Sequence, residues 1–221
     1  MSLVVALVGA ESTGKTMLAQ SLAESFAAQG HRVTVVPEVL REFCDAHGRT
    51  PRQDEQAQIA AEQTRRIALA ARTHELVFAD TTALMIAVYS DTVFGDTSLY
   101  PIAEAAHRDA CGLSLLTALD LPWQADGLQR DGPHVREPVD ALVRAALARA
   151  GVAYSVVFGH GEARLQAALA SVQRALEPHA AADGDVENTR WHWHCERCGD
   201  ANCERHARLP NLGVRGENGA R

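Results

Sequence analysis

The sequence lacks several features that would each assign it to a class of protein. No apolar run approaches the roughly 20 residues that a membrane-spanning helix needs, so we expect no membrane partner. No basic leader precedes the short apolar run at the start, so a secretory signal is not expected either. Basic residues number 21 against 28 acidic ones, and the resulting net charge of -7 argues against a nucleic-acid partner.

Cysteine is also scarce, and its distribution argues against a disulfide framework. Of 5 cysteines, Cys44 and Cys111 stand alone, whereas the others cluster near the C-terminus. With a histidine, the cluster forms a Cys-x-x-Cys-x-x-x-x-Cys-x-x-His pattern, whose ligand types suit a tetrahedral structural zinc ion. The alternative is a tail with reactive thiols, and His192 and His194 are rival fourth ligands. The predicted zinc ligands are Cys195, Cys198, Cys203 and His206.

A glycine-rich motif near the start, by contrast, predicts a specific ligand. A Gly-x-x-x-x-Gly-Lys-Thr sequence lies between the apolar run at residues 3–8 and a stretch of helical periodicity at residues 17–26. Its glycines let successive backbone N–H groups point at phosphate oxygens, and the helix adds the positive end of its dipole. The lysine would bridge the β- and γ-phosphates, and the threonine hydroxyl would hold Mg²⁺. The alternative is a glycine turn with an exposed lysine. The motif predicts that ATP is bound by Gly9, Glu11, Ser12, Thr13, Gly14, Lys15 and Thr16.

Short apolar runs alternate with helical patterns along most of the chain. Besides residues 3–8, we expect strands at 32–36, 76–80, 113–119 and 153–158, and a long helix over 51–72 capped by Thr50. This alternation predicts an α/β fold, a doubly wound parallel five-stranded sheet of the phosphate-loop kinase type, with ligands at the carboxyl ends of the strands. The expected divisions are 1–178, the kinase-like domain; 179–188, a linker; 189–210, the short metal-binding tail; and 211–221, a flexible C-terminus.

Carboxylates follow two of the expected strands. Asp80 ends one of them, at the place where a phosphate-loop protein holds Mg²⁺ together with a residue such as Thr16. The alternative is a carboxylate at a helix N-terminus. Glu38, Arg41 and Glu42 follow the second strand, where a carboxylate could hold ribose hydroxyls or take a proton from the attacking oxygen. They could equally form a solvated helical turn paired at i,i+3 or i,i+4 spacing.

Residues 120–137 combine glycines, arginines and a tryptophan between an expected strand and an expected helix. A kinase needs a lid that excludes water and neutralises the charge developing on the transferred group. Arg130 and Arg136 are the candidates for this role, and Trp123 could stack on a flat cationic ring. The alternative is an ordinary surface loop whose tryptophan is anchored in the core.

Several short sequence patches are more specific to one protein family than the phosphate loop is. They are the Glu-Ser pair at 11–12, Glu-x-x-Arg-Glu-Phe at 38–43, residues 58–63, Phe-Ala-Asp-Thr at 78–81 and Trp-x-x-Asp-Gly-Leu at 123–128. Together they resemble the ribosylnicotinamide kinase domain of NadR-type proteins over about residues 1–178. The resemblance implies ATP-dependent phosphorylation of the ribose 5′-hydroxyl of nicotinamide riboside.

The resemblance also implies a role for each matching residue. Where family members read Asp-Thr-Asp, this chain has Asp-Thr-Thr at 80–82, so one carboxylate is absent. The implied catalytic residues are Lys15, Asp80, Arg130, Arg136 and Glu42. The groups implied to surround the riboside are Glu38, Arg41, Glu42, Trp123 and Asp126.

The sequence thus predicts a small-molecule kinase. It would use ATP and Mg²⁺ to phosphorylate a nucleoside-like acceptor, with nicotinamide riboside as the first candidate. Because ATP is the expected substrate and no export signal is expected, we expect a cytoplasmic protein. The alternative is a nucleotide-sensing regulatory ATPase whose zinc tail recruits a protein or nucleic-acid partner, which predicts slow hydrolysis without an acceptor.

Overall fold

The computed structural model describes residues 2–124 and 132–177, and the strands within them form one parallel sheet. The chain divides into two units, Met1–Pro178 and His179–Arg221, and the sheet belongs to the first. The strands pair in the order β2-β3-β1-β4-β5. Because every neighbouring pair is parallel, their carboxyl ends share one edge of the sheet. The strands are β1 (Leu3–Val8), β2 (Val33–Val36), β3 (Leu76–Asp80), β4 (Leu113–Thr117) and β5 (Ser155–Val157).

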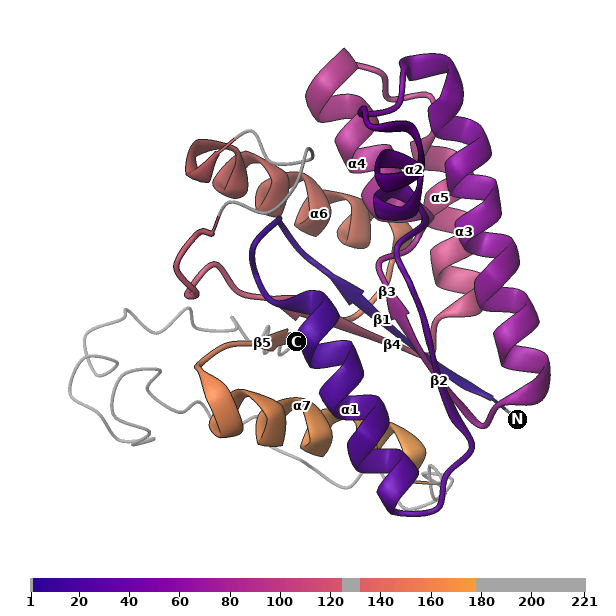
Figure 1. Ribbon diagram of the computed structural model, residues 1–221, viewed down its shortest axis with the longest axis vertical. Coiled ribbons are helices and arrows are strands. Elements are labelled where there is room, and N and C mark those ends of the chain that lie inside the picture. The colour runs from indigo at the N-terminus through magenta and orange to yellow at the C-terminus, as the bar shows by residue number, and fades with distance from the viewer. Residues whose placement is uncertain (1, 125–131, 178–221) are drawn as a thin grey trace, which may run out of the picture. The chain divides into compact units, whose positions relative to one another are not determined.

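Helices cover both faces of this sheet. Figure 1 shows α1 and α7 on one face and α3, α4, α5 and α6 on the other. Such an arrangement is doubly wound, as the alternation of strands and helices predicts. None of the described helices is long and apolar enough to cross a membrane. The helices are α1 (Lys15–Ala28), α2 (Val39–His47), α3 (Gln53–Thr73), α4 (Ala83–Phe94), α5 (Tyr100–Ala110), α6 (Arg136–Ala150) and α7 (Gly161–Leu176), with a 3-10 turn, η1 (Pro133–Val135).

The central strand β1 is apolar throughout because both of its faces are buried. Val5 and Leu7 belong to a hydrophobic cluster with residues of α1 and α7. Ala6 and Val8 point the other way and pack in a cluster with residues of α3, α4, α5 and α6. Side chains alternate between the faces of a strand, so a strand covered on both sides needs an unbroken apolar run.

The structure confirms the five-stranded parallel α/β fold and corrects one helix start. Arg52 is the N-cap of α3 and Gln53 its first residue, so the prediction that Thr50 caps this helix is wrong. The Glu55 carboxylate accepts a hydrogen bond from the Arg52 backbone N–H at 2.8 Å. It thereby satisfies one of the N–H groups that a helix start leaves without a partner, which Thr50 is too far back to do.

Candidate active site

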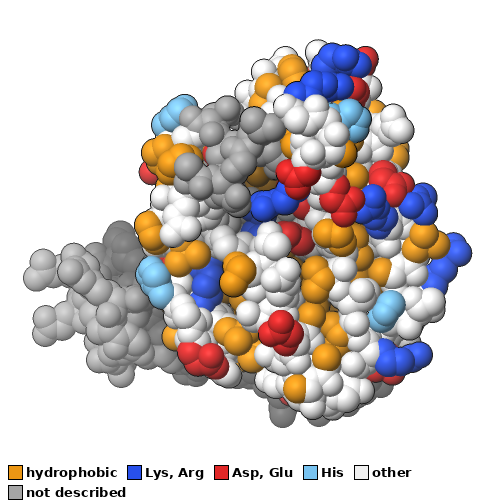
Figure 2. All heavy atoms as spheres, in the orientation of Figure 1, with side chains coloured by type: hydrophobic (Ala, Val, Ile, Leu, Met, Phe, Trp, Pro, Cys, Tyr) orange, Lys and Arg blue, Asp and Glu red, His pale blue; other side chains and the backbone are white. Residues whose placement is uncertain are grey.

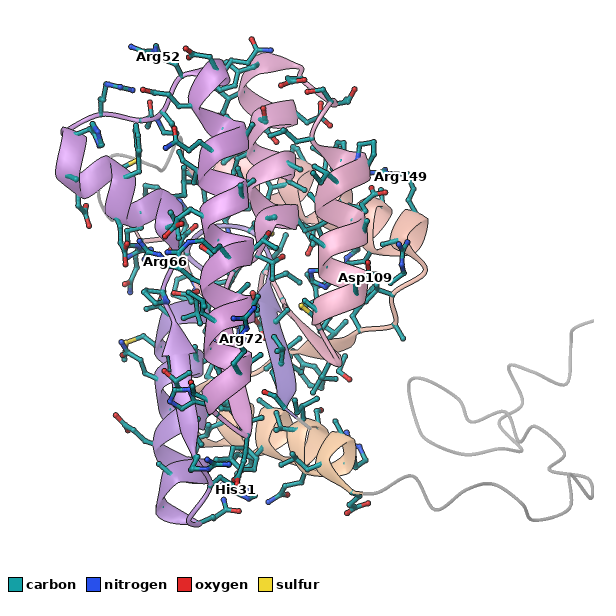
Figure 3. The ribbon with its side chains drawn as sticks, turned by 90° about the vertical axis from the view of Figure 1, so that its right-hand side faces the viewer. His31, Arg52, Arg66, Arg72, Asp109 and Arg149 are labelled. Carbon is teal, nitrogen blue, oxygen red and sulfur yellow. The ribbon has the colours of Figure 1, made fainter. Side chains whose placement is uncertain are left out.

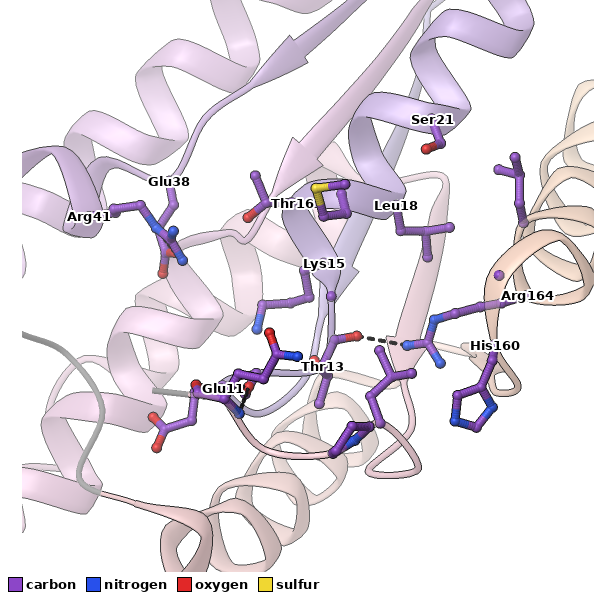
Figure 4. Close-up of a pocket in the computed structure, with 18 of the residues that line it drawn as sticks. Glu11, Thr13, Lys15, Thr16, Leu18, Ser21, Glu38, Arg41, His160 and Arg164 are labelled. Carbon is purple, nitrogen blue, oxygen red and sulfur yellow. Dashed lines mark hydrogen bonds and ion pairs between the residues drawn. The ribbon is translucent and has the colours of Figure 1, made fainter. Parts of the chain in front are cut away.

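A cavity of about 930 Å³ lies at the carboxyl edge of the sheet. The phosphate loop, the start of α1, the N-terminal end of α2, and residues that follow β4 and β5 line it. Figure 4 shows these side chains around one space. Figure 2 shows acidic and basic side chains side by side near the middle of the molecular face that is seen in Figure 1. The volume is near the top of the roughly 300–1,000 Å³ usual for ligand pockets, which leaves room for more than one small molecule.

The phosphate loop adopts the backbone conformation that its glycines allow. Gly9 has φ 139 and Gly14 has φ 75, and a Cβ at Gly9 would collide with the Thr117 side chain. Ser12 is also left-handed, with φ 57, although it is not glycine. Its Oγ accepts a hydrogen bond from the Gln124 N–H at 2.7 Å and lies 3.1 Å from the Gln124 carbonyl. These contacts hold the strained turn and join the loop to the segment after β4.

Lys15 is the only lysine in the sequence, and its side chain is buried in this loop. Its Nζ donates hydrogen bonds to the carbonyl oxygens of Gly9 at 2.9 Å and Ala10 at 2.7 Å. In Figure 4 the side chain extends toward the part of the cavity where Glu38 and Arg41 lie. A buried ammonium group costs free energy unless anions or carbonyls solvate it, so this position favours an anionic ligand over the loop.

Thr16 and Asp80 form the feature that a phosphate-loop cation site requires. The Thr16 hydroxyl donates a hydrogen bond to Asp80 Oδ2 at 2.6 Å. Asp80 is 2% exposed, and among the described residues its Oδ1 has no hydrogen-bond partner. A buried carboxylate oxygen without a partner is costly, whereas a hard divalent cation would satisfy it. Hydroxyl and carboxylate oxygens are the ligands that Mg²⁺ prefers, so these residues fit the ion.

Glu38 and Arg41 face the phosphate loop from the start of α2. Glu38 is buried, lines the cavity, and has Oε2 3.7 Å from Arg41 Nε. The i,i+3 pairing considered as the alternative for this segment is therefore present, and it lies at the cavity.

Gln63 of α3 fixes the backbone on both sides of Glu38. Its Oε1 accepts a hydrogen bond from the Val39 N–H at 2.8 Å, and its Nε2 donates to the carbonyls of Pro37 at 3.3 Å and Thr81 at 3.4 Å. Thr81 follows Asp80 directly and is left-handed, with φ 71. The side chain of Gln63 therefore connects the loop that carries Glu38 with the loop that carries Asp80.

Arg136 is a buried arginine at the first residue of α6. Its Nη1 donates a hydrogen bond to the Leu121 carbonyl at 2.9 Å, while its Nε and Nη2 have no partner among the described residues. A buried guanidinium group with two unused donors favours an anion. Arg136 is not among the residues that line the cavity, so its role as a lid arginine stays a prediction.

Arg164, one turn into α7, is a cavity residue that the sequence analysis missed. Its buried guanidinium donates to the Thr13 carbonyl at 2.8 Å and to Asp120 Oδ1 at 3.1 Å. Burial acts to raise the pKa of the Asp120 carboxyl, but the Gly159 N–H and the Arg164 charge outweigh it and lower the pKa. Because α7 follows β5 directly, a strand-end rule extended by one helical turn would have included Arg164.

His107 contacts the residue that caps the start of α4. Its Nδ1 lies 2.9 Å from the Thr82 hydroxyl, and its Nε2 lies 2.8 Å from the Ser114 hydroxyl. Thr82 caps α4 by accepting a hydrogen bond from the Leu84 N–H at 3.3 Å. Desolvation by burial lowers the pKa of His107 to about 4, so the ring is neutral at pH 7.

Several predicted site residues are not brought to the cavity or are not described. Glu42 points to α3, where its carboxylate pairs with Arg66 Nη1 at 2.6 Å, and it is not among the residues that line the cavity. Figure 3 labels Arg66 on this helix. Trp123 is half-buried and does not line the cavity. Among residues 2–124 and 132–177, no cluster of histidine, cysteine and acidic side chains could hold a metal through three such groups. The predicted residues outside the described ranges are Asp126, Arg130, Cys195, Cys198, Cys203 and His206.

Solved structures share the fold of this chain. NadR in complex with NR has a TM-score of 0.66 at 21% identity, covering 80% of this chain and 51% of that chain. NadR in complex with NAD and AMP-PNP gives a TM-score of 0.63 at 22% identity, covering 79% and 49%. The chain thus spans about half the length of these NadR structures. Deoxyadenosine kinase from M. mycoides, with products dCMP and a flexible dCDP bound, gives 0.54 at 10% identity, covering 78% and 100%.

Sequence comparison assigns the chain to a family. No curated protein sequence matches this chain. A family model described as an AAA domain matches residues 4–164, which include the phosphate loop and the described strands, apart from Leu3 at the start of β1. By this match, together with the phosphate loop and the parallel sheet, the chain belongs to the AAA domain family.

Proposed function

We propose that this protein is an ATP- and Mg²⁺-dependent kinase that transfers the γ-phosphate to the ribose 5′-hydroxyl of a nucleoside-like acceptor, nicotinamide riboside first. The observation that carries the proposal is that Lys15, Thr16 and the buried Glu38 line one cavity. A phosphate-binding loop alone fits any nucleotide-binding protein. The Glu38 carboxylate and Arg41, which line the same cavity, could bind the hydroxyl groups of a second substrate and accept a proton from one of them.

The phosphate loop supplies the nucleotide side of the reaction. Its backbone N–H groups and Lys15 would hold the β- and γ-phosphates, and Thr16 with Asp80 would hold Mg²⁺. The bound ion would neutralise charge on the phosphate oxygens. Arg136, and Arg130 by its sequence position, would close on the transferred group and exclude water.

Glu38 supplies the acceptor side. The acceptor 5′-oxygen forms a bond to the γ-phosphorus as the bond from that phosphorus to the β,γ-bridging oxygen breaks, and ADP leaves. The hydroxyl proton passes to the Glu38 carboxylate, which Arg41 orients through the ion pair at 3.7 Å. Most of the rate enhancement would come from holding the two substrates in line, with charge stabilised by Lys15 and the lid.

The likeness to NadR supports nicotinamide riboside as the first acceptor to test. One of the similar structures is NadR in complex with NR, and another is a deoxyadenosine kinase, so both fold relatives handle nucleoside compounds. At 21% and 10% identity these likenesses concern the fold, and the acceptor is therefore a matter for direct assay.

An acceptor panel tests the proposal. ADP formation is measured with ATP, Mg²⁺ and either nicotinamide riboside, adenosine, cytidine or no acceptor. We expect ADP formation that depends on nicotinamide riboside and falls at least 100-fold in Glu38→Gln, as for loss of a general base. Glu24→Gln, at an exposed position of α1, is the matched control and should behave as the wild type. ADP formation at the same rate with and without every acceptor would instead support the regulatory ATPase.

A further inference from the structure

A second, smaller cavity of about 120 Å³ adjoins the candidate active site. Glu11 and Tyr89 line both cavities, so the two share a wall beside the phosphate loop. The small cavity lies among the N-terminal end of α3, the C-terminal end of α4 and the start of α6. Because whole-ligand pockets usually measure roughly 300–1,000 Å³, this one has room for a single ring of a ligand that extends into the larger cavity.

The walls of this cavity favour a flat aromatic ring. Leu40, Pro51 and Val139 are apolar and buried, and Tyr89 and Phe94 provide aromatic surface. Aromatic rings stack on such surfaces or meet them edge to face, with ring centres about 4.5–7 Å apart. The sugar of such a ligand would extend past Tyr89 toward Glu38 and the phosphate loop.

Gln56 is the polar residue in this wall that needs a partner. The side chain is 4% exposed, and its Oε1 has no hydrogen-bond partner among the described residues. An unsatisfied buried amide oxygen destabilises the fold, and such groups are few in native proteins. Gln63, two helical turns further along α3, shows the contrast, because it is fully buried and makes three hydrogen bonds to backbone groups.

We propose that the small cavity binds the base of the acceptor and that Gln56 determines its specificity by accepting a hydrogen bond from an N–H group of that base. The inference rests on the proposed function and assigns its acceptor class: ribosides of a flat heteroaromatic ring with an amide or amino substituent. A carboxylate substituent is disfavoured, because Gln56 Oε1 would offer it no proton and the Glu11 side chain would repel it.

A matched pair of ribosides tests this assignment. Nicotinamide riboside carries an amide, and nicotinic acid riboside carries a carboxylate on the same ring. For the wild type we expect kcat/KM to be at least tenfold higher for the amide. Gln56→Met keeps the size and removes the acceptor oxygen, so kcat/KM for the amide should fall at least tenfold, mainly through KM, and the preference should narrow to the part that repulsion by Glu11 supplies. Gln56→Glu retains an acceptor oxygen and should keep the preference for the amide.

Two controls separate specificity from folding. Gln58→Met, at an exposed position of the same helix, should leave both ribosides unaffected. The melting temperature of Gln56→Met should equal or exceed that of the wild type, because the substitution removes an unsatisfied buried group. A large fall in melting temperature would mean that Gln56 is structural and would overturn the inference, as would an unchanged preference in Gln56→Met.

A binding measurement tests this inference separately from the proposed function. If the wild type phosphorylates none of the acceptors, the proposed function fails, and calorimetry with each of the two ribosides and a non-hydrolysable ATP analogue decides the inference. Binding of the amide that Gln56→Met weakens at least tenfold would support it. Equal binding of both ribosides, or none, would overturn it.

Discussion

The Thr16 hydroxyl donates a hydrogen bond to the Asp80 carboxylate at 2.6 Å, although the two residues are 64 positions apart. This contact joins the first turn of α1 to the end of β3, and it is possible because β1 and β3 pair in parallel with Leu7 opposite Asp80. Asp80 Oδ1, the other oxygen of the carboxylate, is buried without a hydrogen-bond partner in the described part of the chain. The pair therefore has the composition and burial of a site for a divalent cation.

Replacing Asp80 should weaken activation by Mg²⁺. In Asp80→Asn the negative charge is lost while the shape is kept, so the Mg²⁺ concentration for half-maximal activity should rise about 10- to 100-fold. Titrating Mg²⁺ in the kinase assay measures this shift. Asp45→Asn, at an exposed position of α2, is the control and should not change the titration. An unchanged titration in Asp80→Asn would contradict a role in holding the ion.

Because Lys15 is the only lysine, its contribution can be measured chemically as well as by substitution. Lys15→Met removes the charge that faces the phosphates, so kcat should fall about 10²- to 10³-fold or more. A lysine-directed reactive ATP analogue should add one label to the wild type and none to Lys15→Met, as read by intact-protein mass. Excess ATP should prevent the labelling; labelling that ATP does not prevent would place Lys15 outside the nucleotide site.

Gln63 should contribute to stability, unlike Gln56. Gln63→Met leaves the N–H of Val39 and the carbonyls of Pro37 and Thr81 without this partner, which should cost about 2–4 kcal/mol of unfolding free energy. Urea unfolding of the variant, beside Gln58→Met, measures the loss. Equal stability of the two variants would show that water replaces the Gln63 amide and that the residue does not fix the two loops.

Acid should selectively reduce the stabilisation that His107 gives. Burial lowers the pKa of His107 from 6.5 to about 4, so between these values the unfolded chain binds a proton that the folded protein does not. Its contribution is therefore complete above about pH 6.5 and falls by up to ~3 kcal/mol as the pH approaches 4. The unfolding free energy of the wild type minus that of His107→Gln should decrease over this range. A constant difference would mean that the pKa of His107 is the same in the folded and unfolded states, so that burial does not lower it.

The fold and the phosphate side of the site could be predicted because both depend on local sequence. The phosphate loop needs glycines at fixed positions, and a buried parallel strand needs an unbroken apolar run such as that of β1. The pairing of Thr16 with Asp80 follows from the motif and from the rule that strand ends meet at one edge.

Contacts across long sequence separations could not be predicted in this way. Arg164 meets the Thr13 carbonyl from 151 positions away, and Gln63 bonds Thr81 from 18 positions away, so both depend on how helices pack on the sheet. The same packing turns Glu42 toward Arg66 of α3, whereas Glu38, one helical turn earlier, faces the cavity. Sequence spacing predicts which residues of α2 share a face of the helix, but it does not predict which of these faces packs against α3.

The fate of the γ-phosphate distinguishes transfer to an acceptor from hydrolysis. The enzyme is incubated with Mg²⁺, nicotinamide riboside and ATP that carries ¹⁸O in its γ-phosphate, and the products are analysed by mass spectrometry. For a kinase we expect the labelled phosphate on the riboside, with one phosphorylated riboside for each ADP. Labelled inorganic phosphate, released at the same rate whether or not the riboside is present, would contradict this expectation.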